Sequence, residues 1–213
     1  MIIAGAKKHA KEVLEIFHQN HCIDSLFFFD DLSNDLDDVL FGKFPIIKTL
    51  EGVRQHFLKS PEFVLGLGNP YLRKKLSDKL ANEGGLLTSV IAGTANLGHY
   101  GVSLSQGLNI MHNAMISNCV TVGRGSLINA FSSLHHDVDI GVFCEISPYC
   151  VLLGGCSLGD FCFVGSNSTI LPDIKIGNHV TIGAGAVVIK NLPDNSVAVG
   201  NPARIIKFKA SEG

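Results

Sequence analysis

The sequence has no excess of positive charge. Its 17 Lys and Arg residues are matched by 19 Asp and Glu residues, which gives a formal net charge of −2. A chain without a general basic field is poorly suited to binding nucleic acid or an acidic membrane surface through charge. We therefore expect neither of them among its partners.

The N-terminus lacks the long apolar segment of a secretory signal peptide. The short apolar run of Met1–Ala4 comes before Lys7 and Lys8 rather than after them. A chain that is not secreted stays in a reducing environment, so we expect its six cysteines to remain thiols. The expected location is the cytoplasm.

Charged residues are missing altogether from residues 84–123, which at first suggests a membrane span. The same stretch, however, contains polar side chains such as Asn96, His99 and Gln106, together with many glycines. Most of it also follows a six-residue period that a membrane helix would not show. We predict no membrane span and attribute the low charge to flat faces that pack against partner subunits.

The six-residue period is the dominant feature of the sequence. Every sixth residue from Leu104 to Val188 is Ile, Leu or Val. A hexapeptide period is typical of a parallel β-helix, in which each hexad forms a short strand and a corner. Three hexads close one triangular coil of about 18 residues, and coils stack about 4.8 Å apart. We predict such a β-helix, with the leading aliphatic residue of each hexad pointing inward.

Two other hexad positions are restricted in composition. The fifth position is mostly Ala, Val, Ser or Cys, because little side chain fits beside the leading residue in a thin prism. Glycine recurs at the second position, as in Gly123, Gly141 and Gly159. We attribute these glycines to a corner that favours unusual φ and ψ angles.

Four of the cysteines occupy this fifth position. Cys144, Cys150, Cys156 and Cys162 are six residues apart, so they point from successive faces of the prism. A metal cluster needs ligands that converge on one point. We therefore expect small inward-facing apolar residues and no metal.

The first 88 residues lack the period and alternate between strand and helix patterns. We predict strands at 1–4, 23–29, 62–67 and 86–91, helices at 9–17, 49–58 and 71–82, and a polar loop at 33–42. Such alternation indicates a small, Rossmann-like parallel α/β sheet. We place the domain boundary after residue 88, so that residues 89–213 form the β-helix and a C-terminal tail.

Polar residues gather where the predicted strands of this sheet end. Lys7–His9 follow the first strand, Asp30 and Asp31 end the second, and Gly68 follows the third. Open parallel sheets bind ligands at these carboxyl ends, and a helix N-terminus beside two lysines can hold phosphate. There is no complete G-x-G-x-x-G motif, so solvated lysines are the alternative reading.

His136 and Asp137 stand at a predicted corner of the β-helix. His136 is the third residue of the hexad led by Leu134, and counting by coils places Asn118 on one side of it and Gly154 on the other. A glycine over a histidine leaves a bare patch that a reacting group can approach. A carboxylate next to the ring can accept its hydrogen bond and make it a better base. The pair is a candidate general base, and a surface histidine without a role is the alternative.

The whole chain resembles the two-domain left-handed β-helix sugar acetyltransferases, typified by UDP-4-amino-sugar N-acetyltransferases of bacillosamine- and perosamine-type pathways, with sialic-acid O-acetyltransferases as relatives. The matching segments are Ile2–Val13, Leu67–Pro70, Arg73–Lys75, His136-Asp137 and Gly200–Arg204. The resemblance implies a left-handed coil, whereas the default crossover chirality argues for a right-handed one. It also implies a nucleotide-sugar-binding N-terminal domain and a homotrimer with acetyl-CoA bound along the β-helix, in active sites between subunits.

Carried over by position, the resemblance assigns three sets of residues. It makes His136 the general base and Asp137 the residue that tunes it. It lines the nucleotide-sugar site with Lys7, Lys8, His9, Asp30, Asp31 and Gly68. It places Glu145, Gly154, Ser166 and Ala184 against acetyl-CoA, largely through backbone groups. The family usually has Gly or Ser-Gly where this chain has Lys7-Lys8, and often has a histidine at the position of Glu145.

The resemblance implies acetyl-CoA-dependent N-acetylation of the 4-amino group of a nucleotide-linked amino-deoxy sugar, in surface-glycan or glycoprotein sugar biosynthesis. An amine attacks a thioester only when neutral, so a base must remove a proton. A backbone N–H near Gly154 or Gly155 is the expected oxyanion donor. Direct transfer of this kind needs neither a metal nor an acyl-enzyme.

Several alternatives remain. The acceptor can be a hydroxyl of sialic acid or a related sugar, a cysteine can carry the acyl group in a ping-pong route, and His135 can replace His136 as the base. A γ-class carbonic anhydrase would use histidines such as His99 and His135, which are 36 residues apart, but it lacks a third ligand. A non-catalytic β-helix binding module would leave the fused nucleotide-type domain unexplained.

Overall fold

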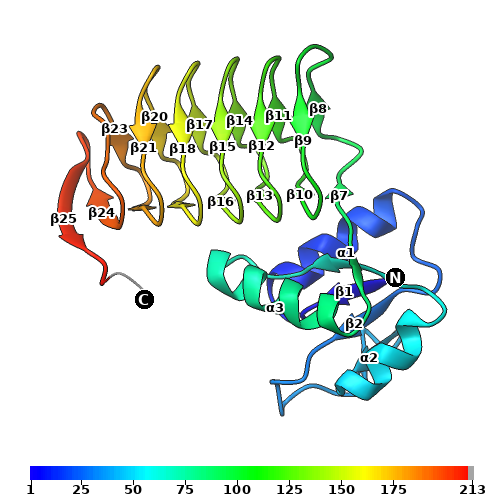
Figure 1. The fold of residues 1–213 in the computed structure, drawn as a ribbon. Helices are drawn as coiled ribbons and strands as arrows, with labels where there is room; N and C mark the ends of the chain where they lie inside the picture. The colour runs from blue at the N-terminus through cyan, green and yellow to red at the C-terminus, as the bar shows by residue number, and fades with distance from the viewer. Residues whose placement is uncertain (211–213) are drawn as a thin grey trace.

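The computed structural model describes residues 1–210 and consists of an α/β domain followed by a triangular β-helix (Figure 1). The α/β domain lies beside the end of the β-helix where the chain enters it, and helix α3 (Pro70–Asn82) runs beneath the first coils. None of the helices within residues 1–210 is long and apolar enough to cross a membrane.

The described part of the α/β domain is built on a six-stranded sheet in the order β3-β4-β2-β1-β5-β6. Its strands are β1 (Ile2–Ala4), β2 (Phe27–Phe29), β3 (Val39–Leu40), β4 (Phe44–Ile47), β5 (Glu62–Leu65) and β6 (Leu86–Leu87). All neighbours are parallel except β3 and β4, which form an antiparallel hairpin at one edge. The predicted Rossmann-like sheet is confirmed, but β3 lies in the predicted polar loop and β4 was not predicted. Pro45 interrupts the short β4 pattern, and it is tolerated because β4 pairs with β2 only through the two residues that follow it, Ile46 and Ile47.

Two of the three helices within residues 1–210 begin at a capping side chain. Besides α3, they are α1 (His9–Gln19) and α2 (Leu50–Phe57). Thr49 is the N-cap of α2 and accepts a hydrogen bond from the Gly52 N–H at 3.1 Å. The side chain of Asn69 caps α3 in the same way, and Pro70 is the first residue of the helix, where its missing N–H costs no hydrogen bond.

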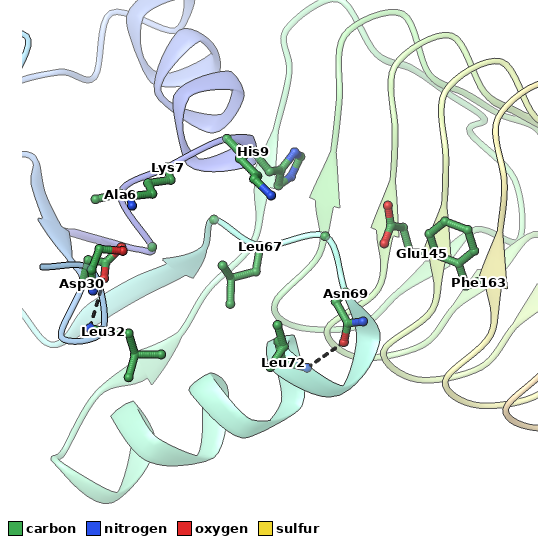
Figure 2. Close-up of a pocket in the computed structure, with 15 residues that line it drawn as sticks. Ala6, Lys7, His9, Asp30, Leu32, Leu67, Asn69, Leu72, Glu145 and Phe163 are labelled. Atoms are coloured by element: carbon green, nitrogen blue, oxygen red, sulfur yellow. Dashed lines mark hydrogen bonds between the residues drawn. The ribbon is translucent and has the colours of Figure 1, made fainter. Parts of the chain in front are cut away.

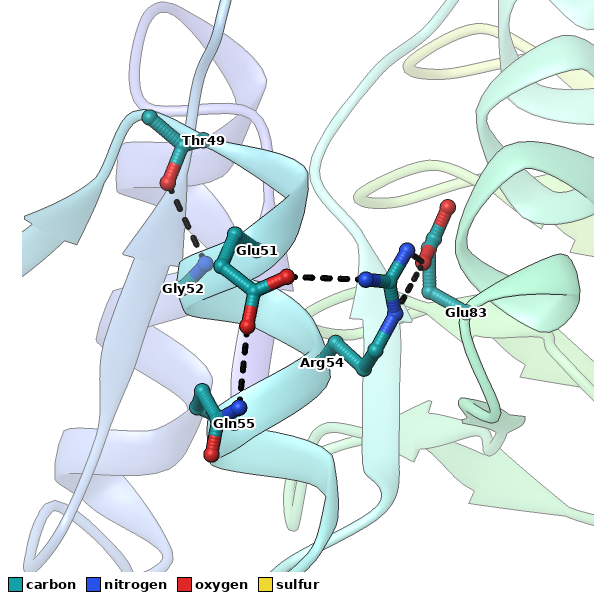
Figure 3. A network of polar contacts seen from close by, with 6 residues as sticks. All are labelled: Thr49, Glu51, Gly52, Arg54, Gln55 and Glu83. Carbon is teal, nitrogen blue, oxygen red and sulfur yellow. Dashed lines mark hydrogen bonds and ion pairs between the residues drawn. The ribbon is translucent and has the colours of Figure 1, made fainter.

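Arg54 joins the end of α3 to α2 (Figure 3). Its Nε and Nη2 atoms donate to Glu83 Oε2 at 3.0 and 2.7 Å, and its Nη1 donates to Glu51 Oε2 at 2.8 Å. The guanidinium is exposed to solvent, which screens such pairs. The network therefore orients the two helices rather than stabilising them strongly.

The β-helix has three faces, which we call the first, second and third face. The described strands of the first face are β7 (Val90–Ile91), β10 (Asn109–Ile110), β13 (Leu127–Ile128), β16 (Glu145–Ile146), β19 (Phe163–Val164), β22 (Thr181–Ile182), β24 (Ser196–Val199) and, antiparallel at its end, β25 (Arg204–Phe208). Those of the second are β8 (Asn96–Leu97), β11 (Met115–Ile116), β14 (Ser133–Leu134), β17 (Val151–Leu152), β20 (Thr169–Ile170) and β23 (Val187–Val188). Those of the third are β9 (Ser103–Leu104), β12 (Thr121–Val122), β15 (Asp139–Ile140), β18 (Ser157–Leu158) and β21 (Lys175–Ile176).

The predicted period is confirmed by the strand register. Ile110 pairs with Ile128, and Ile128 pairs with Ile146, so one coil takes 18 residues (128 − 110). The leading residues from Ile110 to Val188 are buried and form one continuous core. The first coil is longer by one residue, because Met115 pairs with Asn96 (115 − 96 = 19). Because of this extra residue, His99 does not stack two coils away from His135. The 36-residue separation that suggested a shared zinc site of the carbonic anhydrase type therefore loses its meaning.

The second-position glycines have a different cause from the one predicted. Left-handed φ angles occur at the fourth position, for example 61° at Phe131 and 59° at Asp137. At Gly123, a Cβ atom would lie 2.5 Å from the carbonyl carbon of Gly141 in the next coil. Gly123 is therefore needed because the backbones of adjacent coils approach closely there, and not because of a special φ.

The buried cysteines act as hydrogen-bond donors as well as small core residues. Cys144 Sγ donates to the Gly159 carbonyl at 3.1 Å, and Ser126 Oγ makes the equivalent bond to Gly141 at 2.9 Å. Burial raises the pKa of Cys150 to about 11. A ping-pong route through such thiols is disfavoured, because they are protonated at neutral pH and enclosed in the core.

Candidate active site

A cavity of about 580 Å³ lies between the α/β domain and the first face of the β-helix (Figure 2). The loops after β1, β2 and β5 line it together with residues of α3, β16 and β19. Its lining residues are Gly5, Ala6, Lys7, Lys8, His9, Asp30, Leu32, Ser33, Gly66, Leu67, Gly68, Asn69, Leu72, Glu145 and Phe163. The structure thus brings together five of the six predicted nucleotide-sugar residues and adds Glu145, which was predicted to contact acetyl-CoA.

The turn between β1 and α1 shapes one wall of this cavity. Gly5 has φ +108°, and a Cβ atom there would lie 3.2 Å from the Gly66 carbonyl oxygen, so only glycine fits. Lys8 is the N-cap of α1, and its side chain makes no capping hydrogen bond. No side chain therefore caps the positive end of the helix beside the cavity, although the N–H groups of Ala10 and Lys11 donate to the Lys7 and Lys8 carbonyls at 2.9 and 3.0 Å.

The charged residues of the wall have distinct partners. Lys7 pairs with Asp35, which the sequence reasoning did not single out. Asp30 accepts hydrogen bonds from the backbone N–H groups of Leu32 and Ser33 at 3.2 and 2.9 Å, so its carboxylate mainly shapes the loop. Asp31 pairs with Lys79 instead of lining the cavity.

His9 is held by a residue that the sequence reasoning missed. Its Nδ1 lies 3.0 Å from Glu12 Oε2, one helical turn further on, and its side chain is only 10% exposed. This hydrogen bond lowers the pKa of Glu12. The i, i+3 spacing of His9 and Glu12 on a helix was the available signal.

Arg73 locks the α/β domain to the β-helix. The side chain is completely buried, although it stands in a basic run with Lys74 and Lys75. Its Nε donates to the Gly125 carbonyl at 2.8 Å and its Nη1 to the Leu67 carbonyl at 2.7 Å, so it bonds both domains. Burial lowers the pKa of Arg73 to about 9, which still leaves it protonated at neutral pH.

The predicted base stands at a different corner of the prism. His136 Nδ1 lies 2.8 Å from Asp137 Oδ2, and the two side chains are 70% and 63% exposed. When Asp137 accepts the Nδ1 proton, Nε2 keeps its lone pair free toward solvent. The imidazole lies against Gly154, where a Cβ atom would be 2.3 Å from Cε1. The ring itself therefore fills the bare patch that the sequence predicted for a substrate.

Gly154 is consequently needed for the position of His136. We expect Gly154→Ala to push the imidazole away from the corner and to lower turnover by about tenfold or more, because such sites depend on geometry within about an ångström. Steady-state kinetics would measure this effect. In the His136→Ala background the same substitution should change turnover little, since the ring it displaces is absent. A full additional loss there would mean that Gly154 acts independently of the ring.

The cavity and the His136–Asp137 pair do not meet within one chain. His136 follows β14 and precedes β15, so it stands at the corner between the second and third faces. Glu145 and Phe163 belong to the first face, opposite that corner. The remaining predicted acetyl-CoA contacts, Ser166 and Ala184, stand one coil apart at the corner between the first and second faces.

Among residues 1–210, no group of three or more His, Cys, Asp or Glu side chains could hold a metal ion.

Comparisons with known proteins agree with this architecture. The family model described as "PglD N-terminal domain" matches residues 1–80, and "Bacterial transferase hexapeptide (six repeats)" matches residues 155–190. A search of curated proteins finds no match to the chain.

Solved structures match over nearly the whole chain. PerB from Caulobacter crescentus, in complex with CoA and GDP-perosamine, is 28% identical over 97% of this chain and 96% of its own, with a TM-score of 0.87. A mutant of perosamine N-acetyltransferase from the same organism, with histidine replaced by asparagine and the same two ligands bound, is 27% identical over 97% and 96%, with a TM-score of 0.88.

The acetyltransferase domain of PglB from Neisseria gonorrhoeae gives the same result. It is 26% identical over 96% of this chain and 98% of its own, with a TM-score of 0.87. The predicted fold class, a small α/β domain followed by a left-handed β-helix, is confirmed. In both domains the chain is therefore similar to the two-domain left-handed β-helix sugar acetyltransferases of the bacillosamine and perosamine type, and these likenesses identify it as an acetyl-CoA-dependent sugar acyltransferase.

Proposed function

We propose that this enzyme transfers acetyl from acetyl-CoA to the 4-amino group of a nucleotide-linked amino-deoxy sugar. The observation that carries this proposal is the cavity between the two domains, whose wall combines lysines with the N-terminus of α1, which no side chain caps. Such a wall suits a diphosphate. Binding of GDP-perosamine by PerB, which has the same two-domain architecture, supports the assignment.

His136 is the proposed general base, and Asp137 orients it. A general base must present a free nitrogen lone pair to the proton that it removes. The 2.8 Å hydrogen bond between His136 Nδ1 and Asp137 Oδ2 leaves Nε2 available for this role. The base takes a proton from the sugar amine as the nitrogen attacks the thioester carbonyl. CoA leaves as the tetrahedral intermediate collapses. Backbone N–H groups near Gly154 and Gly155 are the proposed oxyanion donors.

The separation of the cavity from His136 supports a shared active site. We propose a homotrimer in which the second face of each subunit packs against a neighbour, so that the cavity of one subunit meets the His136 corner of the next. The outward side chains of the second face are half-buried and uncharged, among them Met115, Val151 and Val187. Those of the third face include Asp139 and Lys175, which suit solvent.

Val151→Glu tests the interface. A buried carboxylate without a partner should dissociate the trimer and remove activity, because no single chain joins cavity and base. Sedimentation or size-exclusion chromatography would give the subunit number. Ser157→Glu, at the outward position of the neighbouring third face, is the control that should stay trimeric. A Val151→Glu variant that remains trimeric would place the interface elsewhere.

The function is tested by acetyl-CoA consumption against a panel of nucleotide 4-amino sugars with UDP, dTDP and GDP as carriers. Acetylation of at least one member is the expected result. The panel includes the matching 4-hydroxy sugars and free sialic acid, and activity confined to these would support O-acetylation instead.

A further inference from the structure

The cavity has opposite charges at its two ends. Lys8 and the N-terminus of α1 provide positive charge on the α/β side, and Lys7 stands beside them with its ammonium paired to Asp35. Glu145 and Phe163 stand at the β-helix end, across the cavity from Asp30 and Leu32 (Figure 2). A ligand that matches this distribution carries negative charge in one part and positive charge in another.

Glu145 is the carboxylate of this cavity that is available to a ligand. Asp30 is engaged by the backbone of its own loop, with N–H groups donating at 3.2 and 2.9 Å. The ion pairs found within residues 1–210 do not include Glu145. The groups that favour its charged form are the Ser147 side chain and the Arg73 guanidinium.

The surroundings of Glu145 suit a cation. Burial raises the pKa of this carboxyl, and Arg73 and Ser147 offset the effect only in part. A positive group brought to the carboxylate would restore the electrostatic stabilisation that burial removes. Phe163 pairs with Glu145 in the strand register, so an aromatic ring stands one coil away from the carboxylate. A carboxylate next to an aromatic ring is a favourable environment for an ammonium group.

Gly68 keeps the carboxylate open to the cavity. A Cβ atom at Gly68 would lie 3.2 Å from each carboxylate oxygen of Glu145, so any larger residue would press on the charged group. The loop after β5 therefore approaches Glu145 with backbone alone. The same loop is held in place by Arg73, which binds the Leu67 carbonyl at 2.7 Å.

We propose that Glu145 binds the ammonium group of the sugar and is the residue that makes the enzyme select an amino sugar over the corresponding hydroxy sugar. The proposal rests on the proposed function and extends it to acceptor choice. The diphosphate lies at Lys7, Lys8 and the α1 N-terminus, and the ammonium lies at Glu145 and Phe163. A neutral hydroxyl at the same place would leave the carboxylate without a cation, so a hydroxy sugar binds more weakly.

Calorimetry on the intact protein without acetyl-CoA tests this proposal. The probes are one nucleotide-linked 4-amino-4-deoxy sugar, the matching 4-hydroxy sugar, and the free nucleoside diphosphate. In the wild type the amino sugar should bind about tenfold or more tightly than the hydroxy sugar. Glu145→Gln should remove most of that preference and leave the affinity for the nucleoside diphosphate unchanged. Glu15→Gln, on the exposed side of α1, is the matched control and should keep the preference.

The outcomes separate the two proposals. Equal affinity of the wild type for both sugars, or a preference that survives Glu145→Gln, would overturn the role of Glu145 while the nucleotide-sugar site stands. No binding of any of the three probes would overturn the nucleotide-sugar function itself. Loss of affinity for the free nucleoside diphosphate in Glu145→Gln would show a disturbed cavity, and it would also count against a specific contact with the amine.

Discussion

His136→Ala should lower turnover by about 10²- to 10⁴-fold, the range that a positioned general base contributes. The side chain is 70% exposed and stands at a corner, so its removal leaves no cavity in the core. The proposed trimer should therefore stay assembled, and the melting temperature should change little. Steady-state kinetics at saturating acetyl-CoA would measure turnover, and size-exclusion chromatography would confirm the assembly.

The neighbouring histidine provides the control. His135 is the residue before His136 on the same corner, and it makes none of the contacts with Asp137 and Gly154 that orient the base. His135→Ala should have a mild effect on turnover. If His135→Ala were the more damaging substitution, the two assignments would exchange. Near-normal rates in His136→Ala would remove the general-base role from that residue.

Arg73→Met should destabilise the folded protein by about 3–5 kcal/mol, because each buried acceptor left without its donor costs about 1–3 kcal/mol and the relieved desolvation of the guanidinium offsets part of the sum. Methionine keeps much of the side-chain volume but donates no hydrogen bond. The carbonyls of Gly125 and Leu67 and the amide oxygen of Asn109 would each lose a donor. Urea unfolding would report the loss, which should appear first as separation of the two domains.

Lys75→Met is the matched control for Arg73→Met. Lys75 is exposed and stands two residues further along α3, so its substitution should change the free energy of unfolding by less than about 0.5 kcal/mol. An Arg73→Met variant as stable as the wild type would mean that the cost of burying the guanidinium equals what its hydrogen bonds contribute.

The sequence by itself determined the β-helix, because each coil repeats one constraint at the leading position and the period is read directly from Leu104 to Val188. It also determined which residue stacks on which, and so predicted Gly154 beside His136. Prediction from the sequence failed where a residue type is required by contact with another segment of the chain. Glycines of the second position are required by the backbone of the next coil, since a Cβ atom on Gly123 would lie 2.5 Å from the carbonyl carbon of Gly141.

Tertiary structure decided the cavity and the domain junction. Arg73 lies in a run of basic residues, a pattern that predicts a solvent-exposed helix face. Only the packing of α3 on the first coils of the β-helix buries its side chain. Glu145 stands 77 residues from Gly68 (145 − 68), and their contact depends on how the two domains dock. Local pattern determines periodic elements because every repeat carries the same signal. Contacts between an α/β loop and a β-helix face carry no such signal, since they form once, across the domain junction.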